Sequence, residues 1–354
     1  MECIRFEEEE KYIKDFLSLP KRLYSKDTNM ENPKETERFL RGTHPLSAYF
    51  TLHKFLVYDE GKAVGRFVIT TYPEDETAYI GFFECVEDSD AARCLFDKAC
   101  EYAKKLGYHR MLGPVDASFW NKYRLKINLF DRLPYTGEPY NKEYYLKLFE
   151  ENGFAVCEHY TSNIFEALKK EDKDPLYDDR LRTFLGKGYK IISPAKEDFD
   201  KVIGQLYELL TELYSDFPVY KNVGYEEFSK VFSDYRYILN MDMVKMAYYK
   251  EQPVGFFVSV PDFGNTVYHL RNLKNLCRVF RIKKKPHRYV MLYMGVHNDH
   301  HGLGKALVGS IMEELRTSGL PSIGALARDG KITQKYGENH VEHCYEYVLL
   351  GKEF

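Results

Sequence analysis

The sequence predicts a mixed α/β (α+β) fold that is divided into two related halves. The chain has 354 residues, which is long for one hydrophobic core and suits two domains. It is 44% hydrophobic and 30% charged, which is typical of a globular protein. The predicted order of elements, strand–strand–strand–helix–strand–helix–strand, occurs twice. This repetition is the main evidence for two domains.

In the first half, two β-rich runs surround Glu60-Gly61 and predict a hairpin over 55–72. Apolar residues at helical spacing predict a helix over 89–106, with Gly107 as its C-terminal cap. The other predicted elements are a strand at 77–86, a short strand at 109–115, a loop at 116–145 and a short helix within 142–154.

The second half repeats this order. An offset of 212 residues pairs Leu95 with Leu307 and Gly107 with Gly319. The predicted elements are strands at 189–194, 288–296, 321–327 and 343–352, a hairpin over 243–260, and helices at 198–214, 225–239, 305–318 and 329–337. We therefore expect domains at 1–168 and 188–354, joined by a charged linker or connecting helix at 169–187.

Composition and charge exclude several classes of protein. The formal net charge is −3, which argues against a nucleic-acid or membrane partner, and no apolar run approaches the ~18 residues of a membrane span. The acidic start MECIRFEEEEKY is unlike a signal peptide, and the seven scattered cysteines fit reduced thiols, so we expect a cytoplasmic protein. No Cys/His cluster has metal-ligand spacing, so no metal is expected. The basic segment 278–288 is interpreted as a solvated hairpin or loop, with a site for an anionic ligand as the alternative.

The segment from Tyr293 to Leu307, YMGVHNDHHGLGKAL, carries the strongest chemical signal. An apolar strand leads into a polar turn, two glycines and a helix. Glycine lets a backbone approach a ligand closely, and the unpaired amides of a helix's first turn bind phosphate oxygens. Lys305 adds a positive charge. The P-loop pattern GxxxxGK[ST] is absent, and no third glycine completes GxGxxG, so nucleotide hydrolysis and dinucleotide binding are not favoured.

This segment resembles the pyrophosphate loop of the GNAT superfamily of N-acetyltransferases, [QR]-x-x-G-x-[GA]. The six matching positions are His301, Gly302, Leu303, Gly304, Lys305 and Ala306. His301 departs from the usual Gln or Arg, and Asn298 from the usual Pro. GRFVITT, GFFE, GPVDASFW and PYTGEPYNKEYY resemble a family of tandem GNAT-like proteins, and the resemblance extends over most of the chain.

The resemblance implies two GNAT-like domains, each a mixed, mostly antiparallel central sheet flanked by helices. It implies acetyl-CoA or another acyl-CoA as co-substrate, with the strand residues Met294, Gly295 and Val296 alongside the pantetheine arm. It also implies direct transfer in a ternary complex, with Tyr336 as the acid that protonates the leaving thiolate. Candidates for the base are His297, Asp299 and His300, because they follow the cofactor strand and histidine titrates near neutrality.

The first half has no such loop. At the 212-residue offset, Asp90 occupies the place of Gly302 and Ala92 that of Gly304. Carboxylates there cap a helix well and would repel a pyrophosphate. We therefore expect one cofactor site, in the second half only.

A long aromatic loop in the first half is a candidate acceptor pocket. An Ω-loop packed by its own side chains is an equally good interpretation. The residues concerned are Trp120, Tyr123, Tyr135 and Glu138, with Asp116, Asn121, Arg124 and Tyr140 near them.

The sequence thus predicts an acyl-CoA-dependent N-acyltransferase acting on a small-molecule or peptide amine. The alternative is a catalytically inactive pseudo-acetyltransferase that binds acyl-CoA or acts as a scaffold. The two differ in whether thioester turnover accompanies CoA binding.

Overall fold

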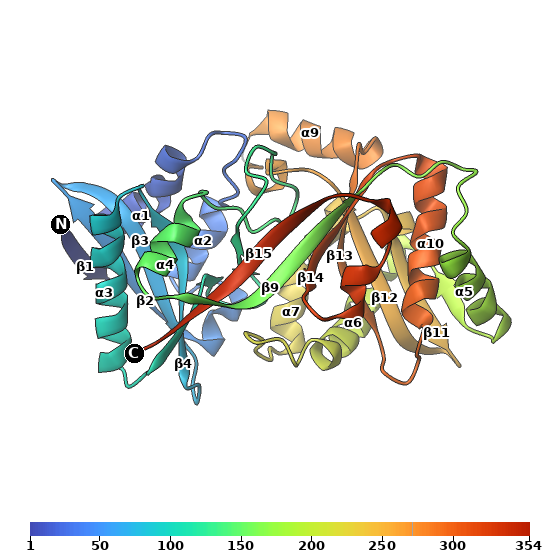
Figure 1. The fold of residues 1–354 in the computed structure, drawn as a ribbon, viewed down its shortest axis with the longest axis horizontal. Coiled ribbons are helices and arrows are strands. Elements are labelled where there is room, and N and C mark those ends of the chain that lie inside the picture. The colour runs from blue at the N-terminus through green and yellow to red at the C-terminus, as the bar shows by residue number, and fades with distance from the viewer. Residues whose placement is uncertain (271) are drawn as a thin grey trace. The chain divides into compact units, whose positions relative to one another are not determined.

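The computed structural model describes residues 1–270 and 272–354. The chain forms two compact units. The N-terminal unit comprises 1–134, 138–160 and 346–354, and the C-terminal unit comprises 135–137 and 161–345. Each has helices packed on a mixed, mostly antiparallel sheet, as Figure 1 shows.

The division differs from the expected boundaries at 168/169 and 187/188. Strand β9 (Ala155–Phe165) passes from the N-terminal to the C-terminal unit, and strand β15 (Val341–Glu353) returns to the N-terminal one. There β15 pairs antiparallel with β5, from Leu350 opposite Gly113 to Glu353 opposite Arg110. Such pairing joins positions far apart in sequence, so local patterns do not reveal it. The expected linker 169–187 contains helix α5 (Pro175–Gly186), which packs on α10.

The N-terminal sheet has the order β1-β2-β3-β4-β5-β15. Phe55, Phe67, Ile80, Leu95 and Phe96 belong to its core, between the sheet and α3. The elements of this unit are β1 (Glu2–Phe6), α1 (Glu10–Leu23), α2 (Pro33–Leu40), η1 (Pro45–Tyr49), β2 (Thr51–Asp59), β3 (Lys62–Thr71), β4 (Thr77–Cys85), α3 (Ser89–Lys105), β5 (Arg110–Gly113), β6 (Val115–Asp116), β7 (Lys122–Tyr123), β8 (Leu125–Lys126) and α4 (Tyr145–Glu151).

The C-terminal sheet has the order β9-β14-β13-β12-β11-β10. The strands of this sheet besides β9 are β10 (Lys190–Ile192), β11 (Val244–Tyr249), β12 (Gln252–Pro261), β13 (Tyr289–Val296) and β14 (Ser322–Arg328). The C-terminal unit also contains the helices η2 (Lys196–Asp198), α6 (Phe199–Leu213), α7 (Tyr225–Phe232), α8 (Tyr235–Ile238), η3 (Met241–Met243), η4 (Thr266–Tyr268), α9 (Leu273–Lys284), α10 (Leu303–Ser318), η5 (Ile332–Lys335) and η6 (Glu338–His340).

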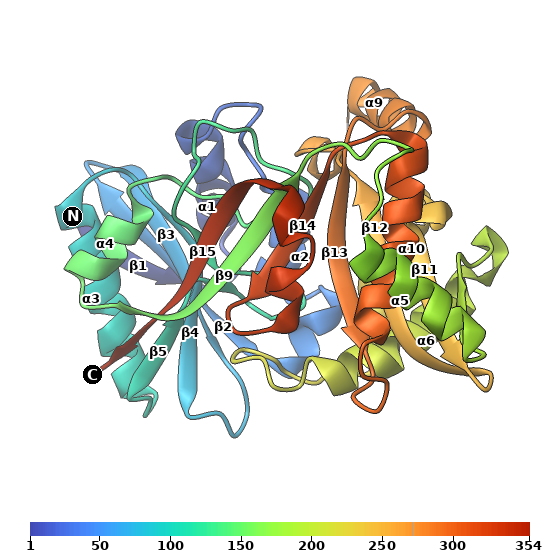
Figure 2. The same cartoon turned by 45° about the vertical axis from the view of Figure 1, so that its right-hand side comes forward.

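The two faces of the C-terminal sheet carry different helices. Met294 and Val296 belong to the apolar cluster that α10 and α5 cover. Gly295, between them, faces the opposite way, since a Cβ built on it would lie 2.7 Å from the Leu213 side chain of α6. Figure 2 shows α5 beside α10 on their common face.

The internal repeat is visible in strand register. In the N-terminal unit β4 pairs parallel with β5 at Thr77–Arg110, Ala78–Met111 and Tyr79–Leu112. In the C-terminal unit β13 pairs parallel with β14 at Tyr289–Ser322, Val290–Ile323 and Met291–Gly324. Each residue number in the C-terminal pairs is 212 higher than its counterpart in the N-terminal pairs, which confirms the predicted offset.

Several expected elements differ from the structure. The predicted helix 329–337 is wrong, since the segment forms only the 3₁₀ turn η5. The predicted helix 225–239 is interrupted at Ser233–Asp234. The basic segment 278–288 is not a hairpin or loop, because helix α9 includes its first seven residues. In that segment Arg and Lys are good helix formers, and Pro286 stands beyond the helix end.

Candidate functional site

The site predicted from the sequence begins where β13 ends and α10 starts. Gly302 is the N-terminal cap of α10 with φ +87°, a conformation that favours glycine. No acidic residue stands in the first turn of α10, and Gly304 is buried within that turn. The first-turn amides and the helix dipole therefore provide an anion-binding end of the kind that phosphates occupy.

Strand β13 departs from its neighbour β14 before it reaches this loop. Pairing between β13 and β14 ends at Met291–Gly324. The β12–β13 register shifts between the pairs Val258–Tyr293 and Ser259–Met291. Among these registered pairs Leu292 has no partner, so β13 contains a bulge. The bulge places both Met291 and Met294 in the apolar cluster under α10. Met294–Val296 therefore run toward the loop without partners in β14.

A cation that the sequence analysis missed lies next to Gly302. Arg180 of α5 is exposed, and its Nη1 would be 3.6 Å from a Cβ on Gly302. Asp174 caps α5 by accepting from the Leu176 amide, and Tyr177, Leu181 and Phe184 form its buried stripe. That stripe was a readable signal within a segment interpreted as a linker or connecting helix. Because the stripe packs against the unit, it determines how α5 is oriented and therefore on which side Arg180 lies.

Tyr336 lies at the same helix terminus. It follows η5, and its hydroxyl is so close to Gly304 that no Cβ would fit between them. The terminal methyl of Met294 is the next neighbour, 3.3 Å from the same built Cβ. Burial and the nearby Tyr177 raise the pKa of Tyr336, so its phenol remains protonated at neutral pH. The structure therefore brings Tyr336 together with the glycine loop.

The three candidates for the base lie in the loop before α10. His297 Nε2 is 3.2 Å from Glu212 of α6, and its Nδ1 is 3.6 Å from the exposed Asp299. His300 Nδ1 is 2.7 Å from the Tyr189 hydroxyl. Burial, with His297 nearby, lowers the pKa of His300. Glu212 was not predicted from the sequence, because no local motif marks it.

The candidate acceptor residues are buried rather than exposed to a pocket. Phe119 packs edge-on against Trp120 and at a tilt against Tyr123, at centroid distances of 5.1 and 5.4 Å. Glu138 forms an ion pair of 2.7 Å with Lys126, and both side chains are fully buried. Tyr135 lies in the C-terminal unit, where its hydroxyl is 2.9 Å from Ser162 Oγ. These contacts of Trp120, Tyr123 and Glu138 lie within the long loop, whereas Tyr135 contacts Ser162 of β9.

The corresponding region of the N-terminal unit is constructed differently. Asp88 caps α3 and Asp90 stands in its first turn. Only Val86–Asp88 separate β4 from α3, whereas His297–Gly302 separate β13 from α10. A Cβ on Gly81 of β4 would overlap the carbonyl of Val115. The backbone of β6 thus occupies the space beside β4.

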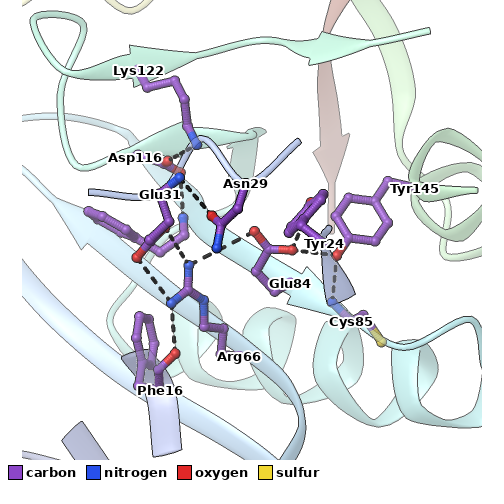
Figure 3. A network of polar contacts seen from close by, with 11 residues as sticks. Phe16, Tyr24, Asn29, Glu31, Arg66, Glu84, Cys85, Asp116, Lys122 and Tyr145 are labelled. Carbon is purple, nitrogen blue, oxygen red and sulfur yellow. Dashed lines mark hydrogen bonds and ion pairs between the residues drawn. The ribbon is translucent and has the colours of Figure 1, made fainter. Parts of the chain in front are cut away.

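A buried polar network joins Glu84 of β4 to Arg66 of β3 and to residues of neighbouring segments (Figure 3). Arg66, with 1% of its side chain exposed, pairs with Glu31 at 3.0 Å and lies 3.9 Å from Glu84. Glu84 also accepts from Tyr145 at 2.6 Å and from Tyr24 at 2.9 Å. Burial raises the pKa of Glu84 to about 7. The difference from the C-terminal unit lies at the start of α3, where Asp88 and Asp90 stand in place of the glycine loop.

Residues 1–270 and 272–354 contain no cluster of three or more His, Cys, Asp or Glu side chains suited to a metal ion. They also contain no helix with the length and apolar character needed to cross a bilayer.

Comparison with solved structures identifies the fold. A tandem GNAT protein from the clavulanic acid biosynthesis pathway aligns over 99% of this chain and 98% of its own, with TM-score 0.54 and 13% identity. The glucosamine N-acetyltransferase region of a fungal GH3 β-N-acetylglucosaminidase aligns over 99% of this chain and 38% of its own, with TM-score 0.55 and 12% identity. The chain therefore has the tandem GNAT fold predicted from its sequence.

Sequence comparison adds less. No family model matches the chain. Protein YghO of Escherichia coli K12 is 25% identical over 150 residues, which are 40% of this chain. The match spans 38% of YghO.

Proposed function

We propose that the chain is an acyl-CoA-dependent N-acyltransferase whose reaction takes place in the C-terminal unit. The observation that carries the proposal is the sequence β13–glycine loop–α10 on a tandem GNAT fold. Strand β13 loses its pairing with β14 before it enters the loop to α10, and the first turn of α10 contains no acidic residue. The pyrophosphate would lie on the amides of Gly302–Gly304, with Arg180 and Lys305 as nearby cations. The pantetheine arm would follow Met294–Val296.

The chemistry assigned to the chain is direct transfer to an amine. The nitrogen attacks the thioester carbon, the C–S bond breaks, and the amine loses one proton while the thiolate gains one. Backbone amides at the Leu292 bulge would polarise the carbonyl. His297, paired with Glu212, would accept the amine's proton, and Tyr336 would supply the thiolate's proton. An exposed Asp299 would act only through His297.

The test is release of CoA thiol from acetyl-CoA over a panel of small amines and peptides, with acylated product identified by mass spectrometry. The proposal expects at least one amine to be acylated by the wild-type chain and not by Gly302→Glu. CoA binding without transfer to any amine would contradict catalysis and indicate the pseudo-acetyltransferase. Thiol release without an acylated amine would indicate hydrolysis instead.

A further inference from the structure

Helix α9 has an apolar surface that its own unit does not cover. Leu273 is 77% exposed and Phe280 is 63% exposed, with Leu276 and Cys277 exposed between them. Positions i, i+3, i+4 and i+7 of a helix form one stripe. The stripe therefore faces away from the protein, the reverse of the usual arrangement in a surface helix.

The opposite side attaches α9 to the C-terminal unit. Val279 is the buried residue of the helix, and Asn275 donates from its side chain to the carbonyl of His269 at 2.9 Å. Lys283 donates to the carbonyl of Tyr237 at 2.7 Å, and Tyr237 is itself 65% exposed. Figure 2 shows α9 as the outermost helix at the top of this unit. The exposed stripe thus belongs to an anchored helix.

Cations flank the stripe. At 100° per residue, Lys274, Arg278 and Arg281 lie along one border of it, and Lys284 stands at its C-terminal end. From Gly264 to Asn298 the sequence contains eight Lys and Arg residues and no Asp or Glu. The chain as a whole has more acidic than basic residues, so this segment is locally positive.

We propose that α9 is an interfacial helix that lies flat on an anionic lipid surface. An exposed stripe of Leu and Phe beside Lys and Arg is the pattern of helices that insert an apolar face at the headgroup boundary. Its 12 residues would span about 18 Å in the plane of the bilayer. The absence of acidic residues matches a uniformly anionic lipid surface, because a protein partner or second copy would present both signs of charge. The chain's net charge, which argued against membranes, does not describe this surface.

The test uses the full chain and vesicles of phosphatidylcholine with and without phosphatidylglycerol. Wild type should sediment with the anionic vesicles and, at high salt or without phosphatidylglycerol, much less. Leu273→Ser with Phe280→Ser should lower the bound fraction by about tenfold or more. Leu133→Ser with Leu176→Ser removes two other exposed leucines, 63% and 49% exposed, and should have no effect.

Thermal melts check that both double variants are folded, as expected for exposed positions. Failure of the wild type to bind anionic vesicles would overturn the proposal, as would equal binding by the α9 variant. A wild-type dimer that becomes monomeric in the α9 variant, without vesicle binding, would identify a second copy of the chain as the occupant. Amine acylation does not enter this test, so its outcome is separate from that of the proposed function.

Discussion

The hydroxyl of Tyr336 lies against Gly304, in the first turn of α10, with no room for a Cβ between them. The two residues are brought together although the segment before Tyr336 is a 3₁₀ turn and not the expected helix. A protonated phenol therefore stands at the helix terminus where the cofactor is expected, and this relationship decides what a substitution of Tyr336 should do.

Tyr336→Phe should lower kcat by about 10- to 10³-fold, the range for loss of a general acid, with little change in KM for acyl-CoA. The ring contact with Tyr177, at 6.4 Å between centroids, is retained in this variant. Steady-state kinetics with the accepted amine gives both constants. A rise in KM with unchanged kcat would show instead that the hydroxyl binds the cofactor's phosphates.

Arg180→Gln should weaken CoA binding by about three- to tenfold, because an exposed cation near a phosphate contributes modestly and is screened by salt. Arg182→Gln is the matched control, since Arg182 lies two residues further along α5 and pairs with Asp179. Calorimetry at two salt concentrations measures both. Equal effects of the two substitutions would mean that only the net charge of α5 matters.

Gly309→Ala should destabilise the C-terminal unit by about 1–3 kcal/mol, the usual cost of overpacking. Its Cβ would lie 2.7 Å from the carbonyl oxygen of Tyr177, where α5 crosses α10. Gly186→Ala is the control, because nothing lies within 4 Å of its Cβ. Hydrogen exchange of α5 and α10 reports the loss. Unchanged protection in Gly309→Ala would contradict close packing of these helices.

The N-terminal unit should become less stable as pH rises. The pKa of Glu84 is about 7 in the folded chain against an ordinary 4.5, so folding favours its protonated form. That contribution to the free energy of unfolding is complete below pH ~4.5 and is lost as pH rises through 7. It amounts to roughly 3 kcal/mol.

Glu84→Gln should remove this dependence, and Glu150→Gln, at an exposed position on α4, should retain it. The one tryptophan of the chain, Trp120, is buried in this unit, so its fluorescence during urea unfolding at each pH is the measurement. The same slope in Glu84→Gln and wild type would show that Glu84 is not the group responsible.

The fold was largely predictable because its signals are local patterns and an internal repeat. The hairpin at Glu60-Gly61, the helix over 89–106 and the 212-residue offset all reappear in the structure. The path of β15 and the approach of Arg180 to Gly302 were not predictable, because each depends on contacts between distant segments. The amphipathic pattern of α9 was concealed by its charges, which suggested a solvated loop. Burial of Trp120 and Tyr123 likewise depends on how the long loop folds on itself.

The central claim is one acyl-CoA site per chain, formed by the glycine loop of the C-terminal unit. Isothermal titration calorimetry of CoA into the wild type and into Gly302→Glu tests it most directly, with Gly186→Glu as a control that adds the same charge where nothing lies within 4 Å of the Cβ. We predict one site in the wild type and in Gly186→Glu. We predict none in Gly302→Glu, which should remain folded with a somewhat lower melting temperature because Gly302 has φ +87°. Two equivalent sites, no site, or undiminished binding by Gly302→Glu would contradict the claim.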